Sequence, residues 1–284
     1  MQTTLNFISP KGAAMPLLGN EYFTLTDVDG FTRVTSEISS VTVPFVDGDQ
    51  VTNIQAQPRT VVLYLRLKQA VGIETAKRYI LQYVKPKLEG TIQLQQGGRN
   101  IQLVGKVEAI ELPRFQQGCV MAITLHCSQP YWEDINFVVQ EISNIINLHY
   151  FPIDQGGLAF PTEGVPFGAY DDDLTQQFDN LGDVETGMII TIIALGEVTN
   201  PKIYNTLTGE YIGVTTTMQG NDEITISTIK GQKTITKNGV NIIDKIMSGS
   251  TFLQLAVGTN EFTIESESGI DDLYFTLTYK QLYV

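Results

Sequence analysis

Short runs of alternating apolar and polar residues fill the second half of this 284-residue sequence. In Leu273–Tyr279 every second residue is a leucine, phenylalanine or tyrosine, and Glu223–Ser227 alternates in the same way. Turn signals separate the runs, as in Gly220-Asn221-Asp222 and Lys237-Asn238-Gly239-Val240. Side chains alternate between the two faces of a strand, so many short alternating runs joined by tight turns predict an antiparallel β-sandwich.

The first half predicts a second β-rich domain that contains one helix. Arg59–Leu67 is rich in β-branched and aromatic residues, which is typical of a strand. Residues 74–84 place apolar side chains at helical spacing, and Pro86 ends the pattern. Two further runs, 90–95 and 100–104, flank Gly97-Gly98, a pair that supplies the positive φ angles of a tight hairpin turn. We therefore expect a β-sandwich-like fold with a single helix in this half.

Regular alternation weakens between Val138 and Asp183. Proline and glycine recur there, for example at Pro152, Gly156-Gly157 and Pro161. Such composition favours loops and connections. The sequence predicts two domains, 1–138 and 139–284, the second carrying an irregular strap at about 150–180.

Charge divides the chain at the same place. Residues 1–138 hold 12 Lys/Arg and 12 Asp/Glu, whereas residues 139–284 hold 6 and 19, which accounts for the whole net charge of −13. An acidic chain argues against sequence-specific nucleic-acid binding, because phosphates are neutralised by Lys and Arg. Neither a signal peptide nor an apolar run long enough for membrane insertion is apparent, so we expect synthesis in a cytosol.

Cys119 and Cys127 share the apolar parity of one predicted strand, with Met121, Ile123 and Leu125 between them. A straight strand would separate the two cysteines by about 26 Å. A disulfide requires Cα atoms within about 7 Å, so we expect two buried free thiols.

Signs of catalysis or of a bound cofactor are weak. The two histidines, His126 and His149, have no partners at metal-ligand spacing, and nucleophile, phosphate-loop and zinc-protease motifs are absent from the sequence. Residues 171–173 are three aspartates that could hold calcium, but a solvated charge run is the simpler interpretation. Glu265 and Glu267 share strand parity and could imitate a glycosidase pair, although exposed carboxylates of this kind are common. We expect no enzyme activity, no cofactor and no metal.

Two surfaces are candidates for binding. The hairpin around Gly97-Gly98 has a polar, nearly uncharged face that suits a subunit interface, or simply faces solvent. Tyr204, Tyr211 and Trp132 could stack against a saccharide, or pack within the protein instead. The candidate interface residues are Thr91, Gln93, Gln95, Gly97, Gly98 and Gln102.

The order of several short motifs resembles that of siphophage distal tail proteins, the adaptors at the tail tip of long-tailed phages. These motifs are Asn180-Leu181-Gly182-Asp183-Val184, the run from Asn200 to Ile212, Gly249-Ser250 with Phe252 and Leu255, Gly258 with Asn260, and Pro130-Tyr131-Trp132. Together they span about half of the chain, while residues 1–58 offer little to match.

The resemblance implies a structural virion protein that forms a homohexameric ring through its N-terminal domain. It implies tail tube protein on one ring face, a tail hub or tail-associated lysin on the other, and a central channel through which DNA passes. It also implies an outer C-terminal sandwich, similar to galectin-like or carbohydrate-binding modules, that holds a receptor-binding protein. Such a protein is assembled in the host cytoplasm and resides at the virion tail tip.

Three functions therefore compete. The chain is a hexameric tail adaptor, a module that binds cell-wall saccharide through Tyr204 or Tyr211, or a glycan-degrading enzyme. The motif order favours the adaptor, and the saccharide-binding module is compatible with it. We further hypothesise a channel lining that is neutral to acidic, along which DNA would slide without sticking.

Overall fold

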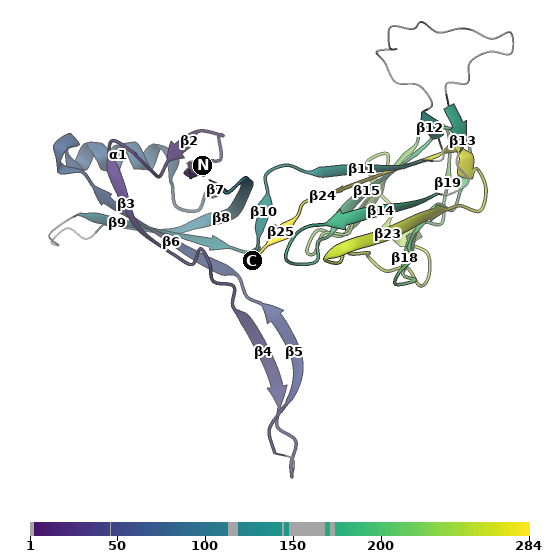
Figure 1. Cartoon of the computed structure of the whole chain (residues 1–284), viewed down its shortest axis with the longest axis horizontal. Coiled ribbons are helices and arrows are strands. Elements are labelled where there is room, and N and C mark those ends of the chain that lie inside the picture. Colours follow the sequence, from purple (N-terminus) through teal and green to yellow (C-terminus); the bar gives the residue numbers. More distant parts are fainter. Residues whose placement is uncertain (1–2, 46, 113–118, 144, 148–167, 171–173) are drawn as a thin grey trace, which may run out of the picture. The chain divides into compact units, whose positions relative to one another are not determined.

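The computed structural model describes residues 3–45, 47–112, 119–143, 145–147, 168–170 and 174–284. The chain divides into an N-terminal unit, residues 1–135 with 282–284, and a C-terminal unit, residues 136–281 (Figure 1). Both units are mainly antiparallel β-structure, which confirms the fold class predicted from the sequence.

A nine-stranded sheet forms the body of the N-terminal unit. Its main path runs β2-β1-β7-β8-β9-β6-β3, and β10 joins β8 to β25. The strands of this sheet are β1 (Thr4–Ile8), β2 (Ala14–Pro16), β3 (Phe23–Asp29), β6 (Arg59–Leu67), β7 (Glu89–Gln96), β8 (Arg99–Glu111), β9 (Val120–Cys127), β10 (Trp132–Asp134) and β25 (Leu282–Tyr283).

Helix α1 (Ile73–Tyr83) follows a short 3-10 turn (Gln69–Val71) and packs against β2 and β6. Its inner side buries Ala76 and Ile80, as the helical spacing predicted. Gly72 precedes the helix with φ 83°, a conformation that favours glycine. Every second residue of β6 and of β9 is buried, and these side chains form one cluster with Ala76 and Ile80 of the helix. The core therefore lies between the sheet and the helix.

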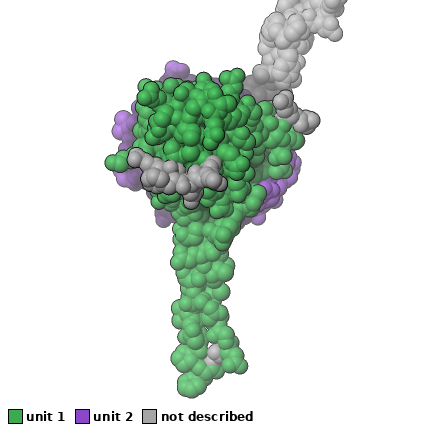
Figure 2. Space-filling view, turned by 90° about the vertical axis from the view of Figure 1, so that its left-hand side faces the viewer, with its two compact units in different colours: residues 1–135, 282–284 green, residues 136–281 purple. Residues whose placement is uncertain are grey.

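A two-stranded arm leaves this body. Strand β4 (Ser36–Val41) pairs with β5 (Gln50–Ala56) and with no other described strand. Figure 2 shows the arm as a narrow stalk below the rest of the N-terminal unit. Every described residue from Ser36 to Gln55 is exposed. The sequence analysis did not predict this element.

The end of the chain returns to the N-terminal unit. Trp132 lies opposite Tyr283 and Glu133 lies opposite Leu282, so β25 forms part of the first sheet. The C-terminal unit is consequently an insertion between β10 and β25. The sequence analysis divided the chain at residue 138 and assigned residues 282–284 to the second domain. In the structure the division falls at residue 135, and residues 282–284 belong to the N-terminal unit.

Two sheets face each other in the C-terminal unit. One has the order β11-β24-β15-β20-β21-β22 and the other β14-β23-β17-β18. The strands of these two sheets are β11 (Val138–Ser143), β14 (Thr175–Asn180), β15 (Met188–Ala194), β17 (Lys202–Asn205), β18 (Tyr211–Gly213), β20 (Glu223–Ser227), β21 (Thr234–Lys237), β22 (Val240–Asn241), β23 (Gly258–Glu265) and β24 (Leu273–Tyr279). The remaining elements are β12 (Ile145–Asn147), β13 (Gly168–Tyr170), β16 (Val198–Thr199), β19 (Thr217–Met218) and the 3-10 turns Ile243–Lys245 and Ile270–Asp272.

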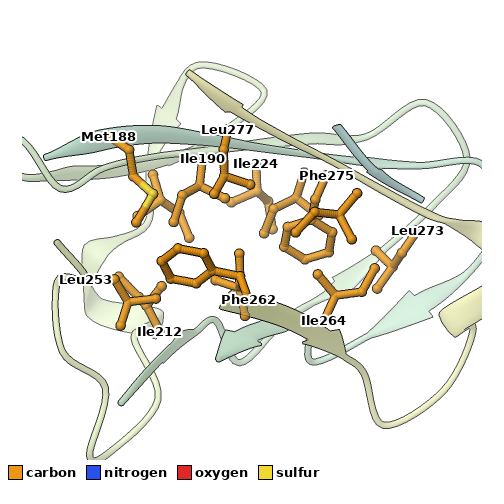
Figure 3. Close-up of a cluster of buried hydrophobic side chains, with 14 of the residues drawn as sticks. Met188, Ile190, Ile212, Ile224, Leu253, Phe262, Ile264, Leu273, Phe275 and Leu277 are labelled. Carbon is orange, nitrogen blue, oxygen red and sulfur yellow. The ribbon is translucent and has the colours of Figure 1, made fainter. Parts of the chain in front are cut away.

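Inward-facing residues of both sheets fill the space between them. Figure 3 shows Phe262 and Ile264 of one sheet facing Ile190 and Phe275 of the other. The alternation of β15 and β24 is complete, with every second side chain buried. These side chains make the single hydrophobic core that a sandwich requires.

Much of the predicted strap at 150–180 lies outside the described residues, and so do His149 and residues 171–173. Its last part, Thr175–Asn180, is strand β14. The predicted calcium alternative at residues 171–173 stays untested.

Both cysteines are free, as predicted, but the prediction that both are buried holds for Cys127 alone. Cys119, just before β9, is half-buried. Burial raises the pKa of the Cys127 thiol to about 11. The other face of β9 carries His126, which is exposed.

We predict that only Cys119 reacts rapidly with a thiol reagent at pH 8 in the folded protein. Cys127 is protonated at that pH because its pKa is raised, and the thiolate is the reactive form. The measurement is colorimetric titration before and after denaturation, expected to count one thiol and then two. Peptide mapping identifies which cysteine is labelled. Rapid labelling of Cys127 in the folded wild-type protein, or in the Cys119→Ser variant, would contradict this prediction.

The turn at Asp222 is held by a network around one carboxylate. Its oxygens accept bonds from the Gln219 backbone N–H at 2.9 Å and from Asn238 Nδ2 at 2.8 Å, and Lys237 Nζ lies 2.9 Å away. These donors lower the pKa of Asp222, the Gln219 N–H contributing most. Asn238 itself begins a tight turn with Gly239, at φ 49° and 78°, as predicted from the sequence.

We predict that Asp222→Asn lowers the urea midpoint of the C-terminal unit at pH 6 and that this difference closes as pH falls below about 4. A carboxylate with a lowered folded-state pKa stabilises the protein above its unfolded pKa of about 3.9 and loses that contribution on acidification. Circular dichroism at a series of pH values measures the effect. A difference that does not change with pH would show that the charge of Asp222 contributes nothing.

Candidate functional site

A row of polar side chains crosses four strands of the N-terminal sheet. Asn6 of β1 lies opposite Gln93 of β7, Gln93 opposite Gln102 of β8, and Gln102 opposite Glu133 of β10. Gln93 Nε2 lies 3.5 Å from Gln102 Oε1, and Gln102 Nε2 donates to Glu133 Oε1 at 2.7 Å. We call this set the amide row.

The remaining predicted interface residues lie on the same hairpin. Thr91 and Gln95 share the face of Gln93, and Gln95 Oε1 accepts from Thr4 Oγ1 at 3.4 Å. Gly97 and Gly98 form the exposed two-residue turn at φ 62° and 89°. The opposite face buries Phe7, Ile92 and Leu103. All six predicted residues are therefore brought together on one polar surface, and their role as a subunit interface stays a prediction.

The structure brings the two candidate saccharide-binding tyrosines together. Tyr204 of β17 lies directly opposite Tyr211 of β18, with ring centroids 5.1 Å apart and planes inclined by 35°. Both rings are half-buried on the outer face of the sheet, whereas their neighbours Ile203 and Ile212 point into the core. The pair, which we call the tyrosine pair, is a cross-strand aromatic contact at the surface of the C-terminal unit.

Polar contacts fix the two rings. Lys202 Nζ donates to Tyr204 Oη at 3.0 Å and lies 3.2 Å from Glu265 Oε2. The pKa of Lys202 is raised, first by the bond to Tyr204 and then by Glu265. Tyr211 Oη donates to the Ser248 carbonyl at 2.6 Å. Lys202 Nζ also lies over the Tyr204 ring, 5.2 Å from its centroid, so both hydroxyl groups and part of the ring surface of the tyrosine pair are engaged within the protein.

Trp132 does not belong to this surface. It is 4% exposed, packs edge-on against Phe31 at 5.2 Å, and donates through Nε1 to the Phe31 carbonyl at 3.1 Å. Trp132 is a core residue of the N-terminal unit, so the suggestion that it stacks a saccharide is wrong.

Three asparagines of the sequence motifs, Asn180, Asn205 and Asn260, are buried and shape turns. Asn205 Oδ1 accepts from the backbone N–H groups of Leu207 and Thr208, at 3.0 and 3.1 Å. Asn260 bonds both backbone groups of Ala256 at 2.9 and 2.8 Å. Asn180 Nδ2 donates to two carbonyls, one of them that of Leu255 at 3.1 Å. These motifs specify local backbone shape, because each amide satisfies groups that the turns leave unpaired.

The other candidate chemistry finds little support. Strand β23 ends at Glu265, so Glu267 lies beyond it, where it accepts a bond from Asn200. Glu265 forms an ion pair with Lys202 at 3.2 Å. Among the described residues, no group of three or more His, Cys, Asp or Glu is placed to hold a metal ion. No helix in the described part of the chain is long and apolar enough to cross a membrane.

Comparison with known proteins identifies the fold. Residues 181–283 match the family described as siphovirus-type tail component, C-terminal domain. The crystal structure of the Dit protein of phage SPP1, described as a paradigm of the hub adsorption apparatus in phages infecting Gram-positive bacteria, is similar over 100% of both chains, with 14% identity and a TM-score of 0.66. A chain of the phage P2 baseplate in its activated conformation with calcium is similar over 98% of both chains, with 11% identity and a TM-score of 0.50. No curated protein sequence matches the chain.

These similarities cover what the sequence motifs could not. The family match begins one residue after Asn180, at the first motif of the C-terminal half, and the similarity to the SPP1 protein extends through residues 1–58. The resemblance stated from the sequence is confirmed to this extent: residues 181–283 match the siphovirus-type tail component family, and the whole chain has the fold of the Dit protein of phage SPP1.

Proposed function

We propose that this protein is a structural component of the virion, a hexameric distal tail adaptor that joins the tail tube to the tail hub or tail-associated lysin. The observation that carries the proposal is similarity to the SPP1 protein over the full length of both chains, including the inserted C-terminal unit. In this role the N-terminal unit forms the ring, and DNA passes through its channel. The protein is assembled in the host cytoplasm and acts in the tail tip.

The distribution of charge supports this arrangement. The N-terminal unit carries 12 basic and 12 acidic residues, and the C-terminal unit carries the excess of 13 acidic ones. A ring crowds six copies of one unit around an axis, so a charge-balanced unit avoids mutual repulsion there. Charges on separate outer units are screened by salt over about 8–10 Å. The same balance supports a neutral to acidic channel.

Mass determination in solution, combined with electron microscopy of the negatively stained protein, tests the proposal. The expected result is a six-membered ring with a central channel, formed by the protein alone or on addition of the purified tail tube protein. A chain that stays strictly monomeric at high concentration, with and without that partner, would overturn it. A positively charged channel would refute the hypothesis about DNA passage alone.

We propose as a second function that the C-terminal unit binds cell-wall saccharide through the tyrosine pair. Two fixed aromatic faces beside Lys202 and Glu265 provide a platform with polar neighbours, the usual composition of a saccharide-binding surface. Alternatively, the same unit holds a receptor-binding protein.

Binding to purified host cell-wall polysaccharide distinguishes these alternatives. Tyr204→Ala and Tyr211→Ala should each reduce binding by about tenfold or more, while Tyr204→Phe retains it because the ring face is kept. Tyr274→Ala is the matched control, since Tyr274 is also half-buried on an outer strand face of this unit. If wild type and Tyr204→Ala bind equally, the saccharide proposal fails and the adaptor proposal is unaffected.

We propose no catalytic activity for this chain. The glycan-degrading alternative requires that purified cell walls be hydrolysed and that Glu265→Gln abolish hydrolysis. Intact walls after prolonged incubation are the expected result.

A further inference from the structure

The arm of the N-terminal unit carries its two isoleucines on one face, while the other face is mainly polar and includes Val41, which is 55% exposed. Ile38 lies opposite Ile54, and after a bulge Ser40 lies opposite Val51, so these side chains share a face with Ala56. Ile38, Ile54 and Val51 are 60%, 64% and 51% exposed. On the other face Glu37 Oε2 accepts from Gln57 Nε2 at 2.6 Å.

An uncovered face of this kind is unusual in a protein that functions alone. A two-stranded hairpin is marginally stable in water, and contiguous exposed apolar side chains mark interaction surfaces. Phe45 at the tip of the arm is fully exposed as well. The apolar face therefore requires a partner surface in the assembled state.

The charge of the arm restricts that partner. Residues 36–58 contain Glu37, Asp47 and Asp49 and no lysine or arginine. Asp47 and Asp49 flank the tip and are exposed. A complementary surface must combine basic and apolar or aromatic side chains, which argues against the strongly acidic C-terminal unit.

A surface of this description lies on the helix side of the same N-terminal unit. Tyr22 stacks on Tyr79 at 4.1 Å with an interplanar angle of 11°, and Tyr79 contacts Tyr83 at 5.2 Å. All three rings are half-buried, and we call them the tyrosine strip. Tyrosine and arginine are enriched at the energetic centres of protein interfaces.

Basic residues surround the tyrosine strip. The segment 66–106, which contains α1, has eight lysine or arginine residues and only two glutamates. Arg78 on the helix and Lys85 and Lys87 just after it are exposed. The tyrosine strip supplies the aromatic surface, and Arg78, Lys85 and Lys87 supply the positive charge, that the partner of the arm requires.

We propose that the arm of one copy packs across the tyrosine strip of the next copy, with Asp47 and Asp49 against Arg78, Lys85 and Lys87. In the N-terminal unit α1 lies against the sheet on one side and the arm extends away on the other, so the contact joins two copies (Figure 1). Two different surfaces of one chain make a heterologous contact, which closes into a ring when repeated. This inference rests on the proposed hexamer.

Replacing the apolar face tests the contact first. Ile38→Ser with Ile54→Ser should shift ring dissociation to at least tenfold higher protein concentration, measured by light scattering at a dilution series. Asn53→Ser with Gln55→Ser, on the polar face, is the matched control and should leave dissociation unchanged. Folding is monitored through the fluorescence of Trp132, the chain's single tryptophan.

Charge reversal then identifies the partner surface. Asp47→Lys with Asp49→Lys, and Arg78→Asp with Lys85→Asp, should each weaken assembly about tenfold or more. In an equimolar mixture of the two variants, the positively charged arm of the first variant can contact the negatively charged helix of the second, so assembly should be restored. Combining all four substitutions in one chain should restore assembly for the same reason. A photo-crosslinking amino acid at Phe45 should link to residues 77–87 of a second copy.

The outcomes separate this inference from the proposed function. A wild-type ring whose stability is unchanged by the arm variants overturns the arm contact and leaves the adaptor proposal standing. Crosslinks from Phe45 only to tail tube or hub protein assign the arm to another partner and also overturn it. A wild-type chain that forms no ring under any of these conditions refutes the adaptor proposal itself, and the arm contact with it.

Discussion

Replacing Phe262 with alanine should lower the free energy of unfolding of the C-terminal unit by about 3–5 kcal/mol. Phe262 is completely buried at the centre of the sandwich, where it contacts Phe178 edge-on at 5.6 Å and faces the opposite sheet (Figure 3). Removing the ring takes away apolar contacts and leaves a cavity that close-packed neighbours fill only in part. A domain is stable by about 5–15 kcal/mol in total, so the loss is a large fraction.

The position of the single tryptophan allows unfolding of the C-terminal unit to be distinguished from unfolding of the N-terminal unit. Trp132 lies in the N-terminal unit, so its fluorescence reports that unit, whereas circular dichroism reports both. Phe262→Ala should lower the thermal midpoint seen by circular dichroism by about 10 °C and change the fluorescence midpoint little. Leu207→Ala is the control, because Leu207 is 66% exposed and its removal should cost almost nothing. Equal effects of the two substitutions would show that Phe262 is not part of a packed core.

Tyr283→Ala should destabilise the N-terminal unit by about 3 kcal/mol although it lies at the far end of the sequence. Tyr283 is 7% exposed and belongs to the core of that unit. The guanidinium of Arg99 lies over the Tyr283 ring, 4.9 Å from the ring centroid. The Tyr283 hydroxyl donates to Asp134 Oδ2 at 3.2 Å. The substitution also weakens the pairing of β25 with β10, where Tyr283 lies opposite Trp132.

Urea unfolding followed by Trp132 fluorescence measures this effect. Tyr283→Phe keeps the ring and its contact with Arg99, so it should cost only about 1 kcal/mol. Val284, which is 57% exposed, provides a neighbouring control through Val284→Ala. A fluorescence midpoint that does not move in Tyr283→Ala would show that the return of the chain to the first sheet does not stabilise it.

Local patterns in the sequence were sufficient for most single elements. The strands Arg59–Leu67 and Leu273–Tyr279 have the bounds that their residue patterns predicted. Alternation, glycine pairs and helix spacing act within a few residues, so they can be recognised without knowledge of the rest of the chain.

Pairing between distant segments was not predictable in this way. The sequence identified Gln93 and Gln102 as candidates but not Glu133, which completes the amide row from a strand 31 residues beyond Gln102. It suggested Tyr204 and Tyr211 separately, and only the register of β17 with β18 places their rings in contact. Register depends on the whole sheet, because a slip of one residue would move every side chain to the other face.

The arm is a second feature that local sequence patterns could not predict. Its alternating residues were present in the sequence, at Ile38 and Ile54 around a glycine-containing turn, but no core of this chain requires them. Alternation identifies an apolar face and cannot say whether that face is covered by the same chain.

The sequence by itself thus determined the β-rich class, the single helix, the tight turns and the division of charge, since each follows from neighbouring residues or from simple counts. The tertiary structure alone showed that the C-terminal unit is an insertion, that Trp132 is a core residue and that one hairpin stands apart from both cores. Those facts depend on which distant strands share hydrogen bonds and bury each other's side chains, and such choices are made by the fold as a whole.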